Sequence, residues 1–135
     1  MYKRMIGVGV DMCAIARIEK AMSKAHFMQR VFTPQERSYI ERMGAGAAQS
    51  AAAMFAAKEA VAKALGTGFA RGIMPEQIEI IHDEYGAPGT TLSGAAKETM
   101  RRLGGARVLL SLSHEEGMAI AFAVIEAGRE EQMKE

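Results

Sequence analysis

A segment built largely of alanine most constrains how this chain can fold. It covers residues 48–65, and the glycines Gly66 and Gly68 come after it. Alanine has the highest helix propensity of all residues and glycine commonly ends a helix, so the segment predicts one long helix. Because its side chains are small, this helix can pack very close to its neighbours. The rest of the chain has to supply those neighbours.

Short patterns on both sides of this helix predict the other elements. β-branched residues and glycines in residues 5–10 are typical of a buried strand that ends near Asp11. Thr33, Pro34 and Glu36 combine an N-cap hydroxyl, a proline at the first helical position and a capping-box glutamate, so they predict a helix that reaches about Met43. Helical periodicity and turn residues predict helices over residues 14–25 and 93–103, and strands over residues 78–82, 90–92, 107–114 and 117–126.

The order and number of these elements favour a single α+β domain. The predicted order is β-α-α-α-β-β-α-β-β, with an antiparallel-rich sheet packed against the alanine-rich helix. A chain of 135 residues can bury one core but is too small for two domains with a cleft between them. We expect one domain over residues 1–128 and a frayed tail over residues 129–135. A site on such a domain can need a partner subunit for its second wall.

The composition excludes several kinds of site and partner. The formal net charge is +1, so the chain has no overall field that would attract nucleic acid or a membrane surface. Cys13 is the only cysteine, which excludes an internal disulfide, disfavours structural zinc and agrees with a reducing cytoplasm. The apolar stretch of residues 5–10 is too short for a signal-peptide core or a membrane span. We therefore expect a cytoplasmic protein.

Asp11 and Glu59 are the first candidates for chemistry. A hard cation such as Mg2+ prefers carboxylate oxygens and keeps several waters, so one aspartate at a strand end and one glutamate on a facing helix suffice when substrate phosphates complete the coordination. Each residue also has a plainer interpretation. Glu59 and Lys63 have the spacing of a stabilising surface pair on a helix, and Asp11 suits a turn or cap.

The cations and glycines of the long helix raise a second set of alternatives. Lys58 and Lys63 are five residues apart and so point about 140° away from each other on a helix. Glu59 and Lys63 share a face, which would place a metal ligand beside a cation. Gly66 and Gly68 let backbone amides approach an anion, or simply end the helix.

Two further candidates have ordinary explanations as well. His114 stands at a strand end, where a histidine is more often a solvated turn residue than a ligand or base. Arg17, Lys20 and Lys24 form a basic helix face, and such a face is usually only solvated.

Four blocks in one order resemble a known family. They are GVDMCAIARIEK near the N-terminus, FTPQE, FAAKEAVAKALGTG in the middle and SLSHE near the C-terminus. Together they resemble the holo-[acyl-carrier-protein] synthases, the short-chain group of the 4'-phosphopantetheinyl transferases. The resemblance implies an enzyme that transfers the phosphopantetheine arm of coenzyme A to a serine hydroxyl of apo acyl carrier protein and releases adenosine 3',5'-bisphosphate. It also implies a homotrimer with coenzyme A sites between adjacent subunits.

The resemblance assigns a role to each candidate. It implies that Asp11 and Glu59 bind Mg2+, and that Lys63 neutralises or protonates the leaving group. It leaves the base that takes the serine proton open between Glu59 and a water on the metal. The other implied roles are phosphate contact for Lys58, nucleotide contact for Gly66, Gly68 and His114, and carrier-protein docking for Arg17, Met22, Lys24 and Phe27.

Two positions depart from the family pattern. Met54 stands where members commonly carry an arginine, and Ala87 stands where they commonly carry a lysine. Fewer cations would then face the phosphates of coenzyme A. This keeps two rival functions in view, a binding or assembly protein that has lost efficient coenzyme A binding, and a Mg2+-dependent phosphohydrolase.

Overall fold

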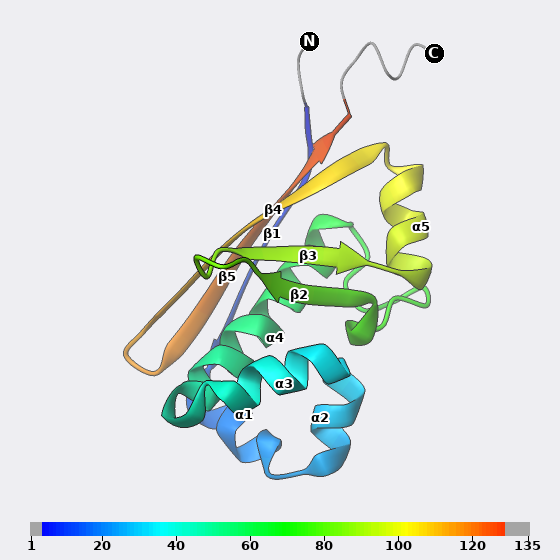
Figure 1. The fold of residues 1–135 in the computed structure, drawn as a ribbon. Helices are drawn as coiled ribbons and strands as arrows, with labels where there is room; N and C mark the ends of the chain where they lie inside the picture. The colour runs from blue at the N-terminus through cyan, green and yellow to red at the C-terminus, as the bar shows by residue number, and fades with distance from the viewer. Residues whose placement is uncertain (1–3, 129–135) are drawn as a thin grey trace.

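The structure is a computed structural model and describes residues 4–128 (Figure 1). The predicted tail, residues 129–135, lies outside the described residues. The helices and strands are β1 (Met5–Ala14), α1 (Ile15–Met22), α2 (Ala25–Val31), α3 (Pro34–Arg42), α4 (Ala47–Ala64), β2 (Ile78–His82), β3 (Pro88–Leu92), α5 (Gly94–Arg102), β4 (Gly105–Glu115) and β5 (Met118–Ala127). Short 3-10 turns cover Gly44–Gly46 and Pro75–Gln77.

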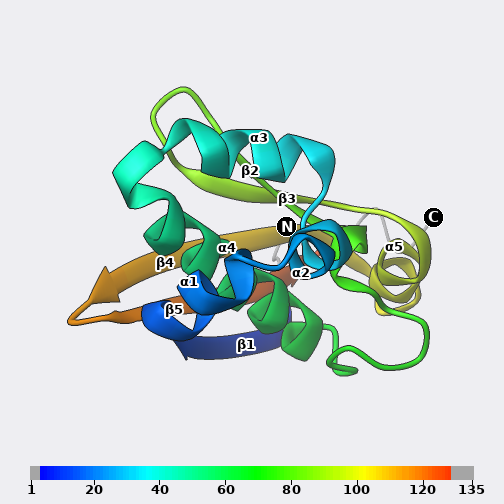
Figure 2. The ribbon, with the colours of Figure 1, turned by 90° about the horizontal axis from the view of Figure 1, so that it is seen from below.

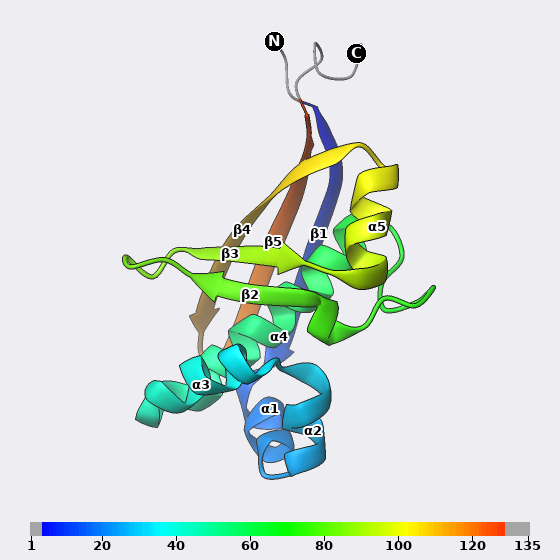
Figure 3. The same cartoon turned by 45° about the vertical axis from the view of Figure 1, so that its right-hand side comes forward.

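The α+β fold is confirmed, and the strands and helices follow the predicted order with one additional short helix, α2. β1, β5 and β4 form an antiparallel sheet in that spatial order, and β2 and β3 form a separate antiparallel hairpin. Figure 2 shows α4 between the three-stranded sheet on one side and α3 with the hairpin on the other. Figure 3 shows α5 at one end of the hairpin, while α1, α2 and α3 gather at the end of the sheet where β1 finishes.

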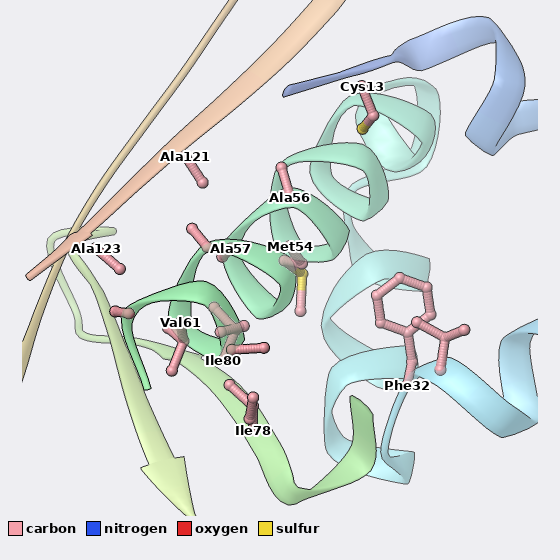
Figure 4. Packing of buried hydrophobic residues seen from close by; sticks show 14 of the residues in the cluster. Cys13, Phe32, Met54, Ala56, Ala57, Val61, Ile78, Ile80, Ala121 and Ala123 are labelled. Carbon is pink, nitrogen blue, oxygen red and sulfur yellow. The ribbon is translucent and has the colours of Figure 1, made fainter. Parts of the chain in front are cut away.

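Glycines in β1 allow α4 to lie directly on the sheet. A Cβ atom on Gly9 would lie 2.0 Å from the carbonyl oxygen of Ala60, and one on Gly7 would lie 2.1 Å from that of Ala64. Real Cβ atoms do not come this close to an oxygen, so only glycine fits at both positions. β5 meets the same helix with fully buried small residues, of which Ala121 and Ala123 are seen facing α4 in Figure 4.

The other side of α4 packs on the hairpin and on the segment before α3. Met54 and Val61 belong to the same buried cluster as Phe32, Ile78 and Ile80 (Figure 4). The predicted start of α3 is confirmed, because the Thr33 hydroxyl accepts a hydrogen bond from the Glu36 amide at 3.1 Å, while the Glu36 carboxylate accepts one from the Thr33 amide at 2.9 Å. The alanine-rich helix therefore forms the centre of the molecule.

The helix predicted over residues 14–25 is wrong in its extent. α1 ends at Met22, and the backbone at Lys24 is extended before α2 begins at Ala25. The Ser23 hydroxyl donates to the Lys20 carbonyl oxygen at 2.8 Å, a local side-chain bond that competes with continuation of the helix. Arg17 therefore lies on α1 and Lys24 in the connection between α1 and α2, and the two do not share one face of a single helix.

Candidate active site

Asp11 lies on the face of β1 that packs against α4. Alternate residues of a strand share a face, so Asp11 lies between Gly9, which contacts α4, and Cys13, whose thiol donates to the Ala52 carbonyl oxygen on the same helix at 3.4 Å. β1 continues past its predicted end near Asp11 as far as Ala14. Asp11 thus lies within an edge strand of the sheet and not in a turn or a helix cap.

Lys63 reaches Asp11 from the last turn of α4. Its Nζ atom donates to Oδ1 of Asp11 at 3.0 Å and to the carbonyl oxygen of Val10 at 3.0 Å. The ion-pair partner of Lys63 is therefore Asp11, and the helical pair with Glu59 suggested by the sequence spacing is not the one that forms. The close approach of α4 to β1 makes this contact possible.

Glu59 lies one turn before Lys63 and is half-buried on the same side of α4. Burial raises the pKa of its carboxyl, the negative charge of Asp11 raises this pKa further, and Lys63 and Arg17 act in the opposite direction. Burial likewise raises the pKa of the Cys13 thiol, which experiences the charges of Arg17, Asp11 and Glu59. Asp11 and Glu59 are therefore close enough to repel each other, and a cation between them would relieve the repulsion.

These two carboxylates suit a hard cation that takes most of its ligands from elsewhere. Within residues 4–128 no group of three or more histidine, cysteine, aspartate or glutamate side chains is arranged to hold a metal ion. Asp11 and Glu59 supply oxygen ligands of the kind that Mg2+ prefers, and Mg2+ commonly combines one or two carboxylates with waters and substrate phosphates. The residues present fit such an ion.

An apolar pocket of about 500 Å3 opens beside Glu59. Phe27 and Val31 of α2 form one part of the wall, Ile73 and Met74 form another, and Glu59 reaches the pocket from α4. The ring centroids of Phe27 and Phe55 are 6.1 Å apart. The pocket is also lined by the polar residues Lys24, His26 and Arg30. It therefore joins an apolar interior to a potential metal ligand and to basic side chains.

A model of the 4'-phosphopantetheinyl transferase superfamily matches residues 7–123 of the chain. The chain belongs to this superfamily. Among its relatives, the holo-[acyl-carrier-protein] synthase of Ruminiclostridium cellulolyticum is 45% identical over 123 residues, which cover 90% of this chain and 92% of the relative. The holo-[acyl-carrier-protein] synthase of Gluconobacter oxydans is 42% identical over 130 residues, which cover 91% of this chain and 83% of the relative.

Solved structures of the superfamily share the fold. The holo-[acyl-carrier-protein] synthase of Neisseria meningitidis aligns with a TM-score of 0.82 at 34% identity and covers 90% of this chain and 98% of its own. The Helicobacter pylori holo-[acyl-carrier-protein] synthase in complex with coenzyme A aligns with a TM-score of 0.76 at 35% identity and covers 87% of this chain and 98% of its own. The resemblance found in the sequence is thereby confirmed.

One residue of this 4'-phosphopantetheinyl transferase is not where its expected role requires it. Lys58 is fully buried, and its ammonium lies 2.8 Å from each of three oxygens, namely Oε1 of Glu36 and the carbonyl oxygens of Pro75 and Ile78. An ammonium has three donors, and all three are used. The expected contact of Lys58 with a phosphate is therefore wrong for this structure. The sequence predicts Glu36 only as a capping residue.

The glycines after α4 end the helix. Gly66 and Gly68 have positive φ angles of 86° and 60°, which favour glycine. Their amides donate to the carbonyl oxygens of Lys63 and Ala62, at 2.9 Å and 3.1 Å. These two amides are thus used in the helix cap, in agreement with the plainer of the two interpretations. Whether the loop also lies beside a nucleotide stays a prediction.

The remaining predicted residues divide between the pocket and other surfaces. Phe27 lines the pocket and Lys24 lies at its edge, whereas Met22 is half-buried against the core. Arg17 is exposed on α1, and its charge acts on Glu59. His114 is exposed on β4, which is separated from β1 by β5, so a single chain does not bring it to Asp11.

The two departures from the family pattern have different surroundings. Met54 is 1% exposed and belongs to the core, so an apolar side chain is well accommodated there. Ala87 is exposed in the turn between β2 and β3, where its amide donates to Oδ1 of Asp83 at 2.9 Å.

Sequence reasoning missed the aromatic lining of the pocket, because Phe55 and Phe69 come from α4 and from the loop after it and share no local pattern.

Proposed function

We propose that this protein transfers the 4'-phosphopantetheine group of coenzyme A to a serine hydroxyl of apo acyl carrier protein and releases adenosine 3',5'-bisphosphate. The observation that carries the proposal is the meeting of Asp11, Glu59 and Lys63 where β1 crosses α4, beside an apolar pocket. The names of the chain's relatives support the same reaction, and one relative was solved in complex with coenzyme A.

The reaction mainly requires that negative charge be neutralised. The serine oxygen forms a new bond to the phosphorus that carries the pantetheine arm, and the bond from this phosphorus to the bridging oxygen breaks. The electron pair leaves with the adenosine bisphosphate. Lys63 is exposed enough to reach a phosphate, and it can stabilise the charge on the leaving group or donate a proton to it. A cation about 4 Å from such a charge contributes roughly 4 kcal/mol at an intermediate dielectric.

Asp11 and Glu59 would hold Mg2+, which when bound supplies positive charge to the phosphate oxygens of the substrate. In this arrangement Asp11 would leave Lys63 partly free, so that its ammonium can turn toward the substrate. The carboxylate of Glu59 also lines the pocket, where it is placed to accept the proton of the attacking hydroxyl. Glu59 is the residue of this chain that we assign to that step.

The pocket beside Glu59 suits the pantetheine arm. Its walls are apolar and aromatic, and its volume of about 500 Å3 is typical of sites for small molecules. The arm is a chain of methylene and amide groups, so it would bury apolar surface against Phe27 and Phe55. Lys24, which lines the pocket, and Arg17, which is exposed on α1, would meet the acidic surface of an acyl carrier protein.

A homotrimer would supply the second wall of the site. The face of the sheet turned away from α4 exposes large apolar side chains on all three strands, with Val10 at 50% and Phe122 at 46% exposure. Such a patch is typical of an interface between subunits. The further exposed apolar residues on this face are Val8, Met12, Leu109 and Ile120. We expect His114 to reach the nucleotide from an adjacent subunit.

We also expect the protein to act in the cytoplasm. No helix within residues 4–128 is both long and apolar enough to cross a membrane.

The test combines the purified protein with Mg2+, coenzyme A and an apo acyl carrier protein, and measures the mass of the carrier. Addition of one phosphopantetheine group to the carrier supports the proposal, provided that a carrier with alanine in place of its acceptor serine gains no mass. Release of adenosine 3',5'-bisphosphate without a carrier would instead indicate a phosphohydrolase. Binding of the carrier without any transfer would indicate a binding or assembly protein.

A further inference from the structure

Lys58, the residue before Glu59 on α4, forms a buried ion pair with Glu36. The lysine points into the core, where Nζ lies 2.8 Å from Oε1 of Glu36. The same ammonium donates to the carbonyl oxygens of Pro75 and Ile78, each at 2.8 Å. Lys58 thus connects α4 both to α3 and to the segment that enters β2.

Glu36 extends these connections. Its Oε1 atom also accepts a hydrogen bond from the Thr33 amide at 2.9 Å, and its Oε2 atom accepts one from the Ile80 amide at 2.6 Å. Thr33 is two residues after the end of α2, and Ile80 lies in the middle of β2. One carboxylate therefore fixes the chain on both sides of Lys58.

The connected segments lead directly into the two walls of the pocket. One wall is formed by Phe27 and Val31 of α2, which the chain leaves just before Thr33. A second wall is formed by Ile73 and Met74, which come just before Pro75. Glu59 approaches the pocket from the helix that carries Lys58. The ion pair is therefore the point at which both walls and the catalytic helix are joined.

Stability alone is a poor explanation for charges at this place. Removing two ions from water is costly, and a well-packed apolar pair of similar volume is often at least as stabilising as a buried ion pair. Burial lowers the pKa of Lys58, an effect that the charge of Glu36 partly offsets. The hydrogen bonds of the ion pair instead fix the positions of the backbone groups that they contact.

We propose that Lys58 and Glu36 are positioning residues that hold the two walls of the pocket at a fixed separation around Glu59. The inference rests on the proposed function, in which this pocket takes the pantetheine arm. Loss of the pair should then weaken the binding of coenzyme A while leaving Asp11, Glu59 and Lys63 in place, since these three are held where β1 contacts α4.

The test uses the double variant Lys58→Met with Glu36→Gln, which removes both charges and leaves no buried ion without a partner. We expect KM for coenzyme A to rise about tenfold or more, because a small displacement of positioning groups has effects of this size. We expect KM for the carrier protein and the affinity for Mn2+, measured by electron paramagnetic resonance, to change less than about twofold. Lys97→Met, at an exposed lysine of α5, is the matched control.

Hydrogen exchange gives a second readout that does not depend on activity. Amides of residues 74–80 should exchange faster in the double variant, and those of β1 and β5 should be unchanged. Wild-type KM for coenzyme A together with unchanged exchange at residues 74–80 would overturn the inference. A lower Tm with an unchanged KM would also overturn it, since that is the result of a merely structural role. Absence of transfer by the wild-type protein would instead count against the proposed function, and the exchange comparison would still test the pair.

Discussion

The Nζ atom of Lys63 lies 3.0 Å from Oδ1 of Asp11, although 52 residues separate the two along the chain. The contact exists because Gly7 and Gly9 bring the backbone of β1 against α4. It places a cation next to one of the two carboxylates that we assign to the metal. Lys63 and a metal ion held by Asp11 would therefore supply positive charge to a phosphate from adjacent positions.

Glu59→Gln should remove most of the transfer activity without unfolding the protein. The substitution keeps the shape of the side chain but deletes the charge, so kcat/KM should fall at least about a hundredfold. Tm should not fall, because the pKa of Glu59 is raised by burial and by Asp11, and the neutral amide avoids that cost. Steady-state kinetics at saturating Mg2+ and thermal unfolding provide the measurement, with Glu98→Gln on the exposed face of α5 as control. Near-normal turnover would contradict the metal assignment.

Lys63→Ala and Lys24→Glu should affect different kinetic constants. Lys63→Ala should lower kcat by about a hundredfold or more with little change in KM for the carrier, because its charge is needed only as the leaving phosphate becomes more negative. Lys24→Glu should raise KM for the carrier, and its kcat should change little. Kinetics with each substrate varied in turn separate the two effects. If Lys24→Glu raises KM for coenzyme A alone, Lys24 belongs to the coenzyme A site and not to the docking surface.

Gly9→Ala should destabilise the protein by about 3 kcal/mol or more, because the new methyl group would push α4 away from β1. The Cβ atom would lie 2.0 Å from the Ala60 carbonyl oxygen, which is backbone and cannot turn aside. Gly46→Ala is the control, since nothing lies within 4 Å of its Cβ position and its φ angle of −90° suits any residue. Denaturant unfolding of both variants provides the comparison, and equal stabilities would refute this account of the packing.

His82 should make the protein less stable in acid. Its ring is stacked on Tyr39 with centroids 4.1 Å apart, and its Nδ1 atom is buried without a hydrogen-bond partner. Burial lowers the pKa of His82 below its usual value of 6.5, while Asp83 acts in the opposite direction. The unfolded chain therefore binds the proton more readily than the folded protein, and stability present above pH 6.5 is lost as the pH falls through the folded-state pKa. His82→Phe keeps a stacked ring but cannot titrate. Its free energy of unfolding minus that of the wild type should increase from pH 8 to pH 5, and a difference that does not change with pH would contradict the prediction.

Phe122→Asp should prevent assembly of the proposed trimer. The side chain lies in the middle of the exposed apolar face, and a carboxylate there would be buried without a partner between subunits. Light scattering should show a trimer for the wild type and a smaller species for the variant. Tyr85→Asp, at the exposed tip of the hairpin, serves as control and should leave the mass unchanged. A wild-type protein that is fully active as a monomer would contradict the proposal of shared sites.

Local patterns in the sequence were sufficient to predict most of the elements, and they supplied the candidate residues for the site. The alanines of α4, the glycines after it and the capping box at Thr33 and Glu36 act through neighbouring backbone groups, so their effect does not depend on the rest of the fold. The break at Ser23 and Lys24 was missed, because the apolar spacing of residues 15–22 continues formally into the next helix. The family itself was recognisable from blocks that cover almost the whole chain.

Only the tertiary structure decided what the charged residues of α4 do. Lys58, Glu59 and Lys63 follow one another within two turns, yet the first is buried against Glu36, the second reaches the pocket and the third pairs with Asp11. Sequence spacing gives the angle between side chains on a helix, but not which neighbour occupies each direction. Those neighbours come from β1, α3 and the segment before β2, and their positions depend on the packing of the whole core. For that reason the sequence determined which residues were available for chemistry, and the fold determined which of them lie at the candidate site.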